Sequence, residues 1–163
     1  MTLKNDLDNV QHQFDLKMMK KALLLARQSE LNGEVPIAAI VVDKDGKIIS
    51  KSMNTRQAQT TVLGHAELIA LHRACKKRHS WRLADCTLYV TLEPCFMCAG
   101  ALVQSRIARV VFAAQDPKGG ALGSLANLAN HDKLNHKFEV KSGLLANESS
   151  ELLRSFFKKK RRR

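Results

Sequence analysis

Cys95 and Cys98 stand three residues apart, directly after an apolar run that ends at Pro94, and they open an apolar helical pattern. Cysteines with this spacing in the first turn of a helix point the same way. The positive end of the helix dipole also favours their thiolate forms. By spacing alone, such a pair is either a redox pair or half of a zinc site. Its chemistry therefore depends on the residues that accompany it.

His65 and Glu67 supply what the zinc interpretation lacks, a third ligand and a group for proton transfer. A structural zinc site is usually closed by four protein ligands, whereas a catalytic site keeps its fourth position for water. No third cysteine or second histidine stands at zinc-finger spacing, so the pattern favours an open site that provides hydroxide near neutral pH. Glu67 is poorly placed to share chelation with His65, and we expect it to move protons between water and substrate.

The two motifs together are more specific than either alone. A redox pair would leave His65 and Glu67 without a role. A His-x-Glu motif followed by Pro-Cys-x-x-Cys is the signature of zinc-dependent nucleobase deaminases. The combination therefore predicts a three-ligand zinc site with a glutamate beside it.

The elements that position these residues follow from hydrophobic periodicity and turn signals. His65 and Cys95 each begin a predicted helix, and helix starts at one edge of a sheet can converge. The first two strands form a hairpin at Asp45-Gly46, and the later strands, joined by long crossovers, are expected to be parallel. We predict an α/β fold with three α/β/α layers, in which a mixed five-stranded sheet has helices on both faces. Helices are expected at 14–32, 64–77, 95–105, 125–130 (short) and from an N-cap at Asn147, strands at 37–42, 48–53, 87–91, 110–113 and 138–140, and loops at 54–63 and 116–124.

The chain of 163 residues is long enough for one domain with its own core. We divide it into a polar, flexible extension at 1–13, a single domain at 14–157 and a basic tail at 158–163. No apolar run approaches the ~20 residues of a membrane span, and the N-terminus lacks the apolar core of a signal peptide. The expected location is the cytoplasm.

The net charge of +12 indicates a polyanionic partner. The alternative is a solvated face with a disordered tail. Cys75 and Cys86 stand alone, and we expect each to be a small buried hydrophobe rather than a ligand or half of a disulfide. Besides the tail, the basic residues cluster in mid-chain, at Arg73, Lys76, Lys77, Arg78 and Arg82.

From about Phe14 to Arg161 the chain resembles the TadA family, the bacterial tRNA-specific adenosine deaminases of the cytidine and deoxycytidylate deaminase superfamily. The most specific stretch runs from Thr87 to Ser124. It contains Thr-Leu-Glu-Pro-Cys-Phe-Met-Cys-Ala-Gly-Ala, Ser105-Arg106-Ile107 and Arg109-Val110-Val111-Phe112, then Asp116, Lys118, Gly120, Ala121, Gly123 and Ser124. Glu34-Val35-Pro36, Asn54 and Phe156-Phe157 match as well.

The resemblance implies an activity and a cofactor. His65, Cys95 and Cys98 would bind one zinc ion per subunit, with water as the fourth ligand. Zinc-bound hydroxide would attack C6 of the wobble adenosine in a tRNA anticodon, that of an arginine tRNA. Glu67 would act as the proton shuttle, so that ammonia leaves and inosine remains.

The resemblance also implies contacts with RNA. Asn54 would hydrogen-bond the flipped base and Val35 would wall its pocket. The Asp116 and Lys118 side chains would meet the anticodon backbone. On the last helix, Phe157 and Arg161 would contact flanking nucleotides. Because members of the family are homodimers, the resemblance also implies a homodimer. Phosphate contacts of this kind are consistent with the positive charge.

The chain departs from the family pattern just before His65. Thr61-Val62-Leu63-Gly64 replaces the usual Asp-Pro-x-Ala, which affects the loop over the pocket and its contacts with the neighbouring nucleotide. Gly64 in place of alanine is expected to leave the metal undisturbed. Ala38 and Ala114, where glycine is common, should cause only small packing changes.

Two alternatives remain open at the level of sequence. The first is a deaminase of a free nucleobase or nucleotide of the cytosine or guanine type, against which the basic tail and the loop at 116–124 argue. The second is a non-catalytic RNA-binding module with a structural zinc. That module requires a fourth protein ligand, such as Cys75 or Cys86, and a replaceable Glu67.

Overall fold

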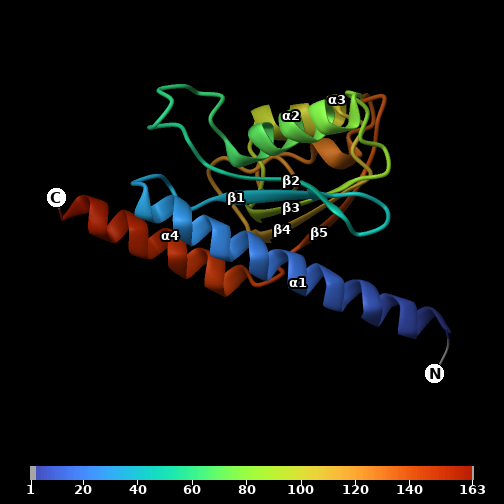
Figure 1. Cartoon of the computed structure of the whole chain (residues 1–163), viewed down its shortest axis with the longest axis horizontal. Coiled ribbons are helices and arrows are strands. Elements are labelled where there is room, and N and C mark those ends of the chain that lie inside the picture. Colours follow the sequence, from blue (N-terminus) through green and yellow to red (C-terminus); the bar gives the residue numbers. More distant parts are fainter. Residues whose placement is uncertain (1–2, 163) are drawn as a thin grey trace.

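The computed structural model describes residues 3–162, and these form a three-layer α/β/α sandwich. Two helices, α1 and α4, cover one face of the central sheet, and α2 and α3 cover the other (Figure 1). The helices are α1 Leu3–Leu31, α2 Ala66–Arg78, α3 Phe96–Gln104 and α4 Ala146–Arg161, and the strands are β1 Ala38–Val42, β2 Ile48–Met53, β3 Thr87–Leu92, β4 Arg109–Ala114 and β5 Glu139–Ser142, with a 3₁₀ turn, η1, at Leu128–Asn130. The predicted fold class is confirmed.

The sheet has the strand order β2-β1-β3-β4-β5. Strand β1 is antiparallel to both β2 and β3, whereas β3–β4 and β4–β5 are parallel. The β1–β2 hairpin turns at Gly46, whose φ of 77° suits glycine. The prediction of a hairpin followed by parallel strands is therefore confirmed.

The core consists of two apolar clusters, one on each face of the sheet. In β3, Leu88 and Val90 belong to the cluster under α2 and α3, while Tyr89 between them belongs to the cluster under α1. This alternation follows from the two-residue period of a strand. Because both faces are covered, β1 is buried along its whole length.

Three helix boundaries differ from the sequence prediction. Helix α1 begins at Leu3 rather than at residue 14, so the described part of the expected extension is helical. Leu7 and Val10 stand at helical spacing there but are both 69% exposed, so these turns contribute little to the core. The expected N-cap at Asn147 is wrong, because α4 starts at Ala146 after Leu145, whose φ is 57°. The helix also continues through Lys158 to Arg161, where a separate tail was expected.

Other boundaries shift by a few residues. The short helix expected at 125–130 is limited to the 3₁₀ turn at Leu128–Asn130. His65 and Cys95, expected inside or at the start of helices, are the N-cap residues of α2 and α3. Among the described helices, none combines the length and the apolar character that crossing a membrane requires.

A buried carboxylate fastens α1 to the sheet. Asp15 is fully buried and accepts two hydrogen bonds from the Arg109 guanidinium, at 2.8 and 2.9 Å. Tyr89 Oη, Gln11 Nε2 and Lys141 Nζ also donate to it, at 2.7, 2.9 and 3.0 Å. Burial by itself raises the pKa of Asp15, but these donors hold it well below its usual range. The network links α1 to β3, β4 and β5.

We expect Asp15→Asn to lower the free energy of unfolding by about 3 kcal/mol, because the change removes the buried partner of the Arg109 charge and leaves it only the exposed Glu139 carboxylate, 2.9 Å away. Since the folded-state pKa of Asp15 is depressed, the carboxylate stabilises the fold above its unfolded pKa of about 4, and the contribution is lost as the pH falls below that value. Urea unfolding at pH 7 and at pH 3 measures both effects. The control is Asp85→Asn in the more exposed pair with Arg78, which should cost less than about 1 kcal/mol. Equal losses for the two variants would contradict the prediction.

Candidate active site

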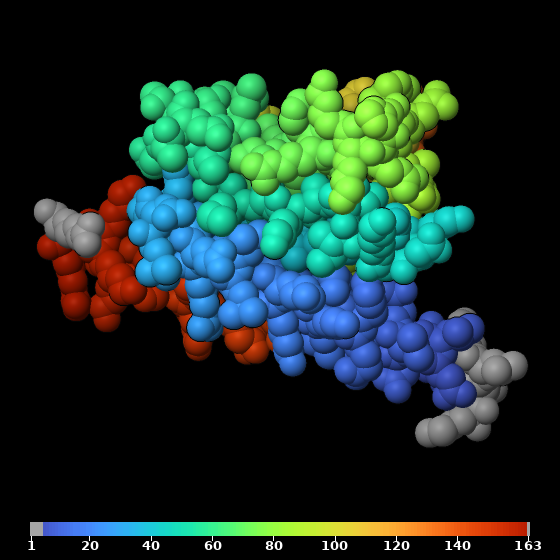
Figure 2. Space-filling model, viewed as in Figure 1, coloured from blue at the N-terminus to red at the C-terminus, as the bar shows by residue number. Residues whose placement is uncertain are grey.

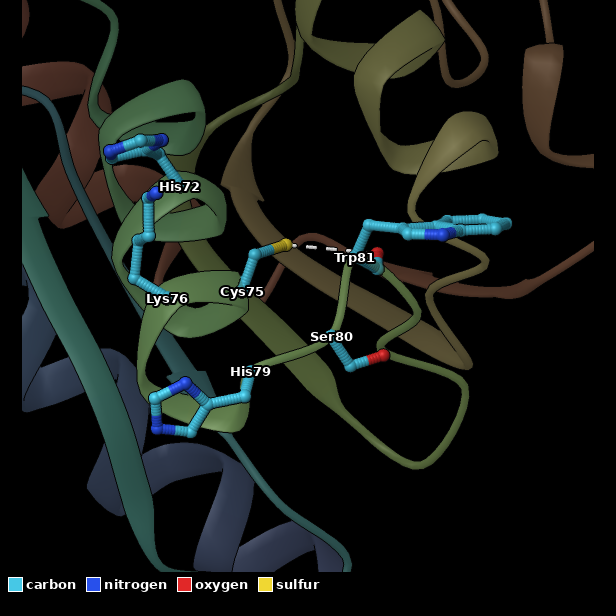
Figure 3. A pocket seen from close by; sticks show the side chains of 6 residues that line it. All are labelled: His72, Cys75, Lys76, His79, Ser80 and Trp81. Carbon is cyan, nitrogen blue, oxygen red and sulfur yellow. Dashed lines mark hydrogen bonds between the residues drawn. The ribbon is translucent and has the colours of Figure 1, made fainter.

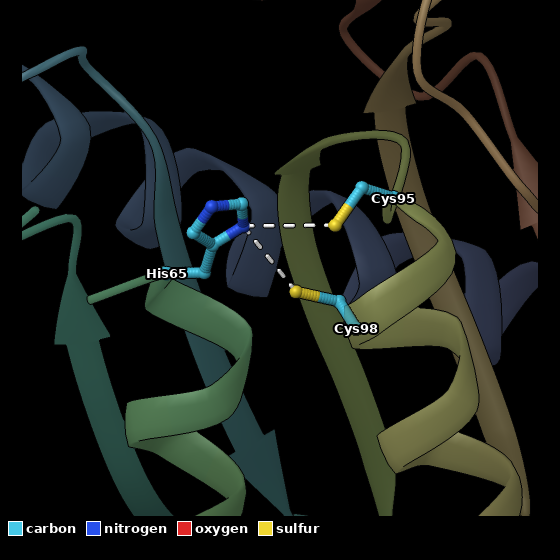
Figure 4. A group of neighbouring side chains, drawn as sticks. All are labelled: His65, Cys95 and Cys98. Atoms are coloured by element: carbon cyan, nitrogen blue, oxygen red, sulfur yellow. Dashed lines mark hydrogen bonds between the residues drawn. The ribbon is translucent and has the colours of Figure 1, made fainter. Parts of the chain in front are cut away.

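His65 and the two cysteines of α3 converge at one edge of the sheet. Figure 4 shows the His65 ring, from the start of α2, directed at the Cys95 and Cys98 thiols from the start of α3. Nδ1 of His65 lies 3.7 Å from Cys95 Sγ and 3.5 Å from Cys98 Sγ. In a tetrahedral zinc site with bonds of 2.0–2.3 Å, ligand atoms lie about 3.6 Å apart. The three donors therefore fit one zinc ion by both chemistry and spacing.

The two thiols differ in their environments. Cys98 is fully buried and Cys95 is half-buried. The Cys98 thiol, together with His65, lowers the pKa of Cys95 to about 3, and Cys95 and burial in turn raise the pKa of Cys98. The hydrogen bond to Cys95 likewise raises the pKa of His65. A thiolate at the start of a helix beside a protonated neighbour is a group prepared to bind a cation.

Glu67 lies in the first turn of α2, only 4% exposed. Its burial raises the pKa of the carboxyl to about 7. Within the described residues, the metal-ligating group contains His65, Cys95 and Cys98 but not Glu67. The carboxyl thus lies beside the donor set rather than in it, where a group that exchanges protons near neutral pH is useful.

A cavity of about 230 Å³ brings His65, Glu67 and Cys95 together with residues from four other segments of the chain. Four residues expected to bind substrate line it, namely Val35, Asn54, Asp116 and Phe157. Four more that were not singled out from the sequence also line it, namely Ile37, Arg56, Leu92 and Glu93. Figure 2 shows why distant segments meet here: the end of α1 (light blue), the region of loop 54–63 (green) and the end of α4 (red) gather at one end of the molecule.

Lys118 and Arg161 are not brought into this cavity. Lys118 is exposed on the glycine-rich loop, where its backbone N–H donates to Asp116. Arg161 lines a neighbouring hollow on α4 that also contains Phe157. The two hollows share the Phe157 ring, which is 45% exposed. The basic end of α4 is thus continuous with the mouth of the cavity.

Glu93 fixes the loop at 116–124 against the metal-binding segment. Its buried carboxylate accepts hydrogen bonds from the backbone N–H groups of Asp116 (3.0 Å), Leu122 (3.1 Å) and Ser124 (2.9 Å), and from the Ser124 hydroxyl. Burial opposes the charge, but these donors lower the pKa of Glu93 below its usual value. A Cβ at Gly120 would lie 2.2 Å from the Glu93 carboxyl carbon, so only glycine fits there. No periodicity in the sequence marks this role, because its partners lie more than twenty residues away.

Gly64 sets the position of the loop at 54–63. The Thr55 N–H donates to the Gly64 carbonyl at 2.8 Å. A Cβ on Gly64 would lie 2.7 Å from the backbone nitrogen of Arg56. Glycine in place of alanine therefore allows a closer approach of the loop, with Arg56 at the cavity wall. Val62 and Leu63, at the departure from the family pattern, are 66% and 59% exposed.

Cys75 and Cys86 lie away from the metal-ligating group. Cys75 belongs to a separate hollow at the far end of α2, where its thiol points at the Trp81 carbonyl 3.7 Å away (Figure 3). Cys86 is fully buried, as expected, and its Sγ lies 3.5 Å from Asp85 Oδ1. Burial raises the pKa of both thiols. In the described part of the chain, neither cysteine is placed to be the fourth ligand of a structural zinc.

Comparisons with known proteins show that this chain is similar to deaminases. Residues 14–161 match the family model of the MafB19-like deaminases. The chain is 47% identical over 156 residues to a tRNA-specific adenosine deaminase of Haemophilus influenzae, covering 96% of this chain and 90% of the relative. It is 47% identical over 145 residues to that of Bacillus subtilis, covering 89% of each. A solved structure from a study of A-to-I editing by tRNA:A34 deaminases at the wobble position superposes with a TM-score of 0.79 at 42% identity, covering 83% of this chain and 97% of that one.

We expect Gly64→Ala to displace the loop at 54–63 and to lower the free energy of unfolding by about 1–3 kcal/mol, because the new methyl group meets backbone rather than a flexible side chain. The measurement is urea unfolding, with amide hydrogen exchange at Thr55 as a local probe. Gly100→Ala in α3 is the matched control, since a Cβ there meets nothing within 4 Å, and a helical alanine is favoured over glycine by up to about 1 kcal/mol. Identical behaviour of the two variants would disprove close packing at Gly64.

Proposed function

Because the chain belongs to the family of tRNA-specific adenosine deaminases, we propose that it hydrolyses the wobble adenosine of a tRNA anticodon to inosine with the help of zinc. Proteins of this family are hydrolytic deaminases, and so is this chain. The single observation that carries the proposal is the convergence of His65, Cys95 and Cys98 at a cavity that His65, Cys95 and the buried Glu67 line. An arginine tRNA, expected from the resemblance, is the specific substrate that we propose.

His65, Cys95 and Cys98 would hold the zinc ion, one per subunit. When bound, zinc supplies a Lewis acid that brings the pKa of a coordinated water close to 7. Three protein donors leave one position of a tetrahedral site for that water. The helix starts that carry His65 and Cys95 fix these donors before the metal arrives.

Glu67 carries the protons of the reaction. Its carboxylate takes a proton from the attacking water as the C6–O bond forms, and delivers it to N1 of adenine. The proton of the new C6 hydroxyl then passes through the same carboxylate to the amino group, and the C6–N bond breaks as the C6 carbonyl forms. Adenosine and water thus become inosine and ammonia, with Glu67 returned to its starting state.

The cavity walls suit a single extruded base. Asn54 is buried and offers amide groups to the base edge, and Val35 adds an apolar wall. Asp116 and Phe157 lie at the wall of the cavity, and Lys118 and Arg161 extend its surroundings with positive charge. We propose that these four side chains contact the anticodon loop, whose unstacked bases are accessible to a deaminase pocket.

Charge supports RNA over a free base as the substrate. A net charge of +12 has no use in binding a small neutral molecule, whereas an anticodon stem-loop presents a row of phosphates. We further infer that residues 14–157 make up the catalytic domain, that the protein works as a homodimer, and that a tRNA substrate places it in the cytoplasm.

Replacement of Glu67 tests the catalytic assignment. Glu67→Gln should reduce inosine formation in an anticodon stem-loop of arginine tRNA by about 10²–10⁴-fold, because proton transfer is lost. Inosine is quantified by nuclease digestion and chromatography, with free cytosine, guanine and adenosine as parallel substrates. Glu139→Gln, at an exposed carboxylate on β5, is the control and should keep full activity. Activity on a free base with none on RNA would overturn the proposed substrate.

The metal assignment has its own measurement. We expect about one zinc per chain by elemental analysis of the purified protein, and a loss of most of it in Cys98→Ser. Cys75→Ser is the matched control and should retain zinc, because its thiol points at Trp81. Loss of zinc from both variants would favour a structural site with four protein ligands.

A further inference from the structure

Glu34 is a buried carboxylate next to the cavity that the proposed reaction does not use. It is 2% exposed, and none of the salt bridges within the described residues involves it. Its Oε1 accepts the backbone N–H of Ala58 at 2.8 Å, and its Oε2 accepts from Asn54 Nδ2 at 3.4 Å. Burying a carboxylate costs free energy unless it is hydrogen-bonded. The two hydrogen bonds of Glu34 are therefore the features to explain.

The backbone around Glu34 is held firmly. Helix α1 ends at Leu31, and Gly33 follows it with a φ of 77°. The Glu34 N–H then donates to the Ser29 carbonyl at 3.1 Å. The Ser29 hydroxyl in turn donates to the carbonyls of Val35 and Asn54, at 3.4 and 3.3 Å. The position of the carboxylate is therefore set by the end of α1, independently of the loop that it contacts.

The chemistry of the carboxylate dictates which way the Asn54 amide faces. An ionised carboxylate only accepts hydrogen bonds, so the Asn54 atom that meets it must be the amide nitrogen. The Asn54 backbone is itself fixed, with its N–H on the Ile37 carbonyl at 3.0 Å. Within the described residues, no protein donor reaches Asn54 Oδ1. The amide oxygen and the second N–H thus remain for the contents of the cavity.

We propose that Glu34 is a positioning residue: it presents the Asn54 amide to the substrate base in one fixed orientation and ties the loop at 54–63 to the end of α1. The proposal rests on the function proposed above, in which Asn54 meets the extruded base. Through Ala58, the same carboxylate also holds the loop segment that carries Arg56 at the cavity wall.

An isosteric change separates charge from shape. In Glu34→Gln, the side-chain oxygen must stay on the Ala58 N–H, because an amide NH₂ cannot accept a hydrogen bond. The NH₂ group then faces Asn54 and requires its oxygen. Asn54 must turn over, and the group that it offers to the cavity changes from acceptor to donor.

A double-mutant cycle tests the coupling. The four proteins are wild type, Glu34→Gln, Asn54→Ala and the double variant, assayed for kcat/KM on the anticodon stem-loop. We expect Glu34→Gln to lower kcat/KM at least tenfold in the wild-type background and less than twofold in the Asn54→Ala background. An equal loss in both backgrounds would show that Glu34 is only structural and would overturn the proposal.

A second pair of variants guards against simple misfolding. In Glu34→Gln/Asn54→Asp, the NH₂ group introduced at position 34 donates to one oxygen of the carboxylate introduced at position 54. The other carboxylate oxygen again faces the cavity as an acceptor, so activity should recover relative to Glu34→Gln alone. Glu30→Gln, at a partly buried carboxylate of the same helix end that pairs with Lys159, is the acid-to-amide control, with zinc content and melting temperature checked for each variant. No recovery in the paired variant would count against the orientation argument.

One measurement is independent of activity. In the NMR spectrum, the Asn54 side-chain amide, identified by its absence in Asn54→Ala, should exchange slowly in wild type and shift in Glu34→Gln. If wild type forms no inosine, the proposed function fails while this spectrum still decides the orientation of Asn54. If inosine forms but neither the spectrum nor the cycle shows coupling, the role of Glu34 fails while the proposed function stands.

Discussion

The site depends on one topological constraint, the shared direction of β2 and β3. Both strands are antiparallel to β1, which lies between them, so they run the same way and end at the same edge of the sheet. The helices that follow them, α2 and α3, pack on the same face, and each starts at that edge (Figure 1). His65 and Cys95 are the residues at these two starts. Donors thirty residues apart in the chain thus meet at one edge of the sheet.

Three buried glutamates lie near this edge of the sheet, and each has a different role. Glu67 lies at the donor set, while Glu34 and Glu93 each accept backbone N–H groups from a loop at the cavity wall. An acceptor-only group can gather several N–H donors from an irregular segment, which no apolar side chain can do. The loops at 54–63 and 116–124 are held in place by charge-assisted hydrogen bonds, and in the second loop the buried Ala121 and Leu122 add apolar packing in the core. The cavity is therefore built to keep its shape before substrate arrives.

The sequence was sufficient for the donor set, because residue type and spacing determine metal chemistry, and for the sheet, because crossover length determines strand direction. It was insufficient where a role depends on distant partners. The function of Glu93 becomes visible only with Leu122 and Ser124 folded onto it, and Arg56 has no local signal at all. The first turns of α1 escaped prediction because most residues of 1–13 are polar and because Leu7 and Val10, although at helical spacing, are exposed rather than packed in the core. The Asn147 N-cap failed because Leu145 takes the turn that leads from β5 into α4.

The Asp15 network has a consequence for the order in which the protein can assemble. Its acceptor lies in α1, but Arg109 is 94 residues away along the chain and Lys141 is 126 residues away. Contacts of such long range make folding slow, because the chain entropy is lost before the contact energy is gained. During vectorial synthesis, α1 must keep Asp15 in water until β4 and β5 have been made. Helix α1 is thus committed to its place on the sheet only after β4 and β5 have been synthesised.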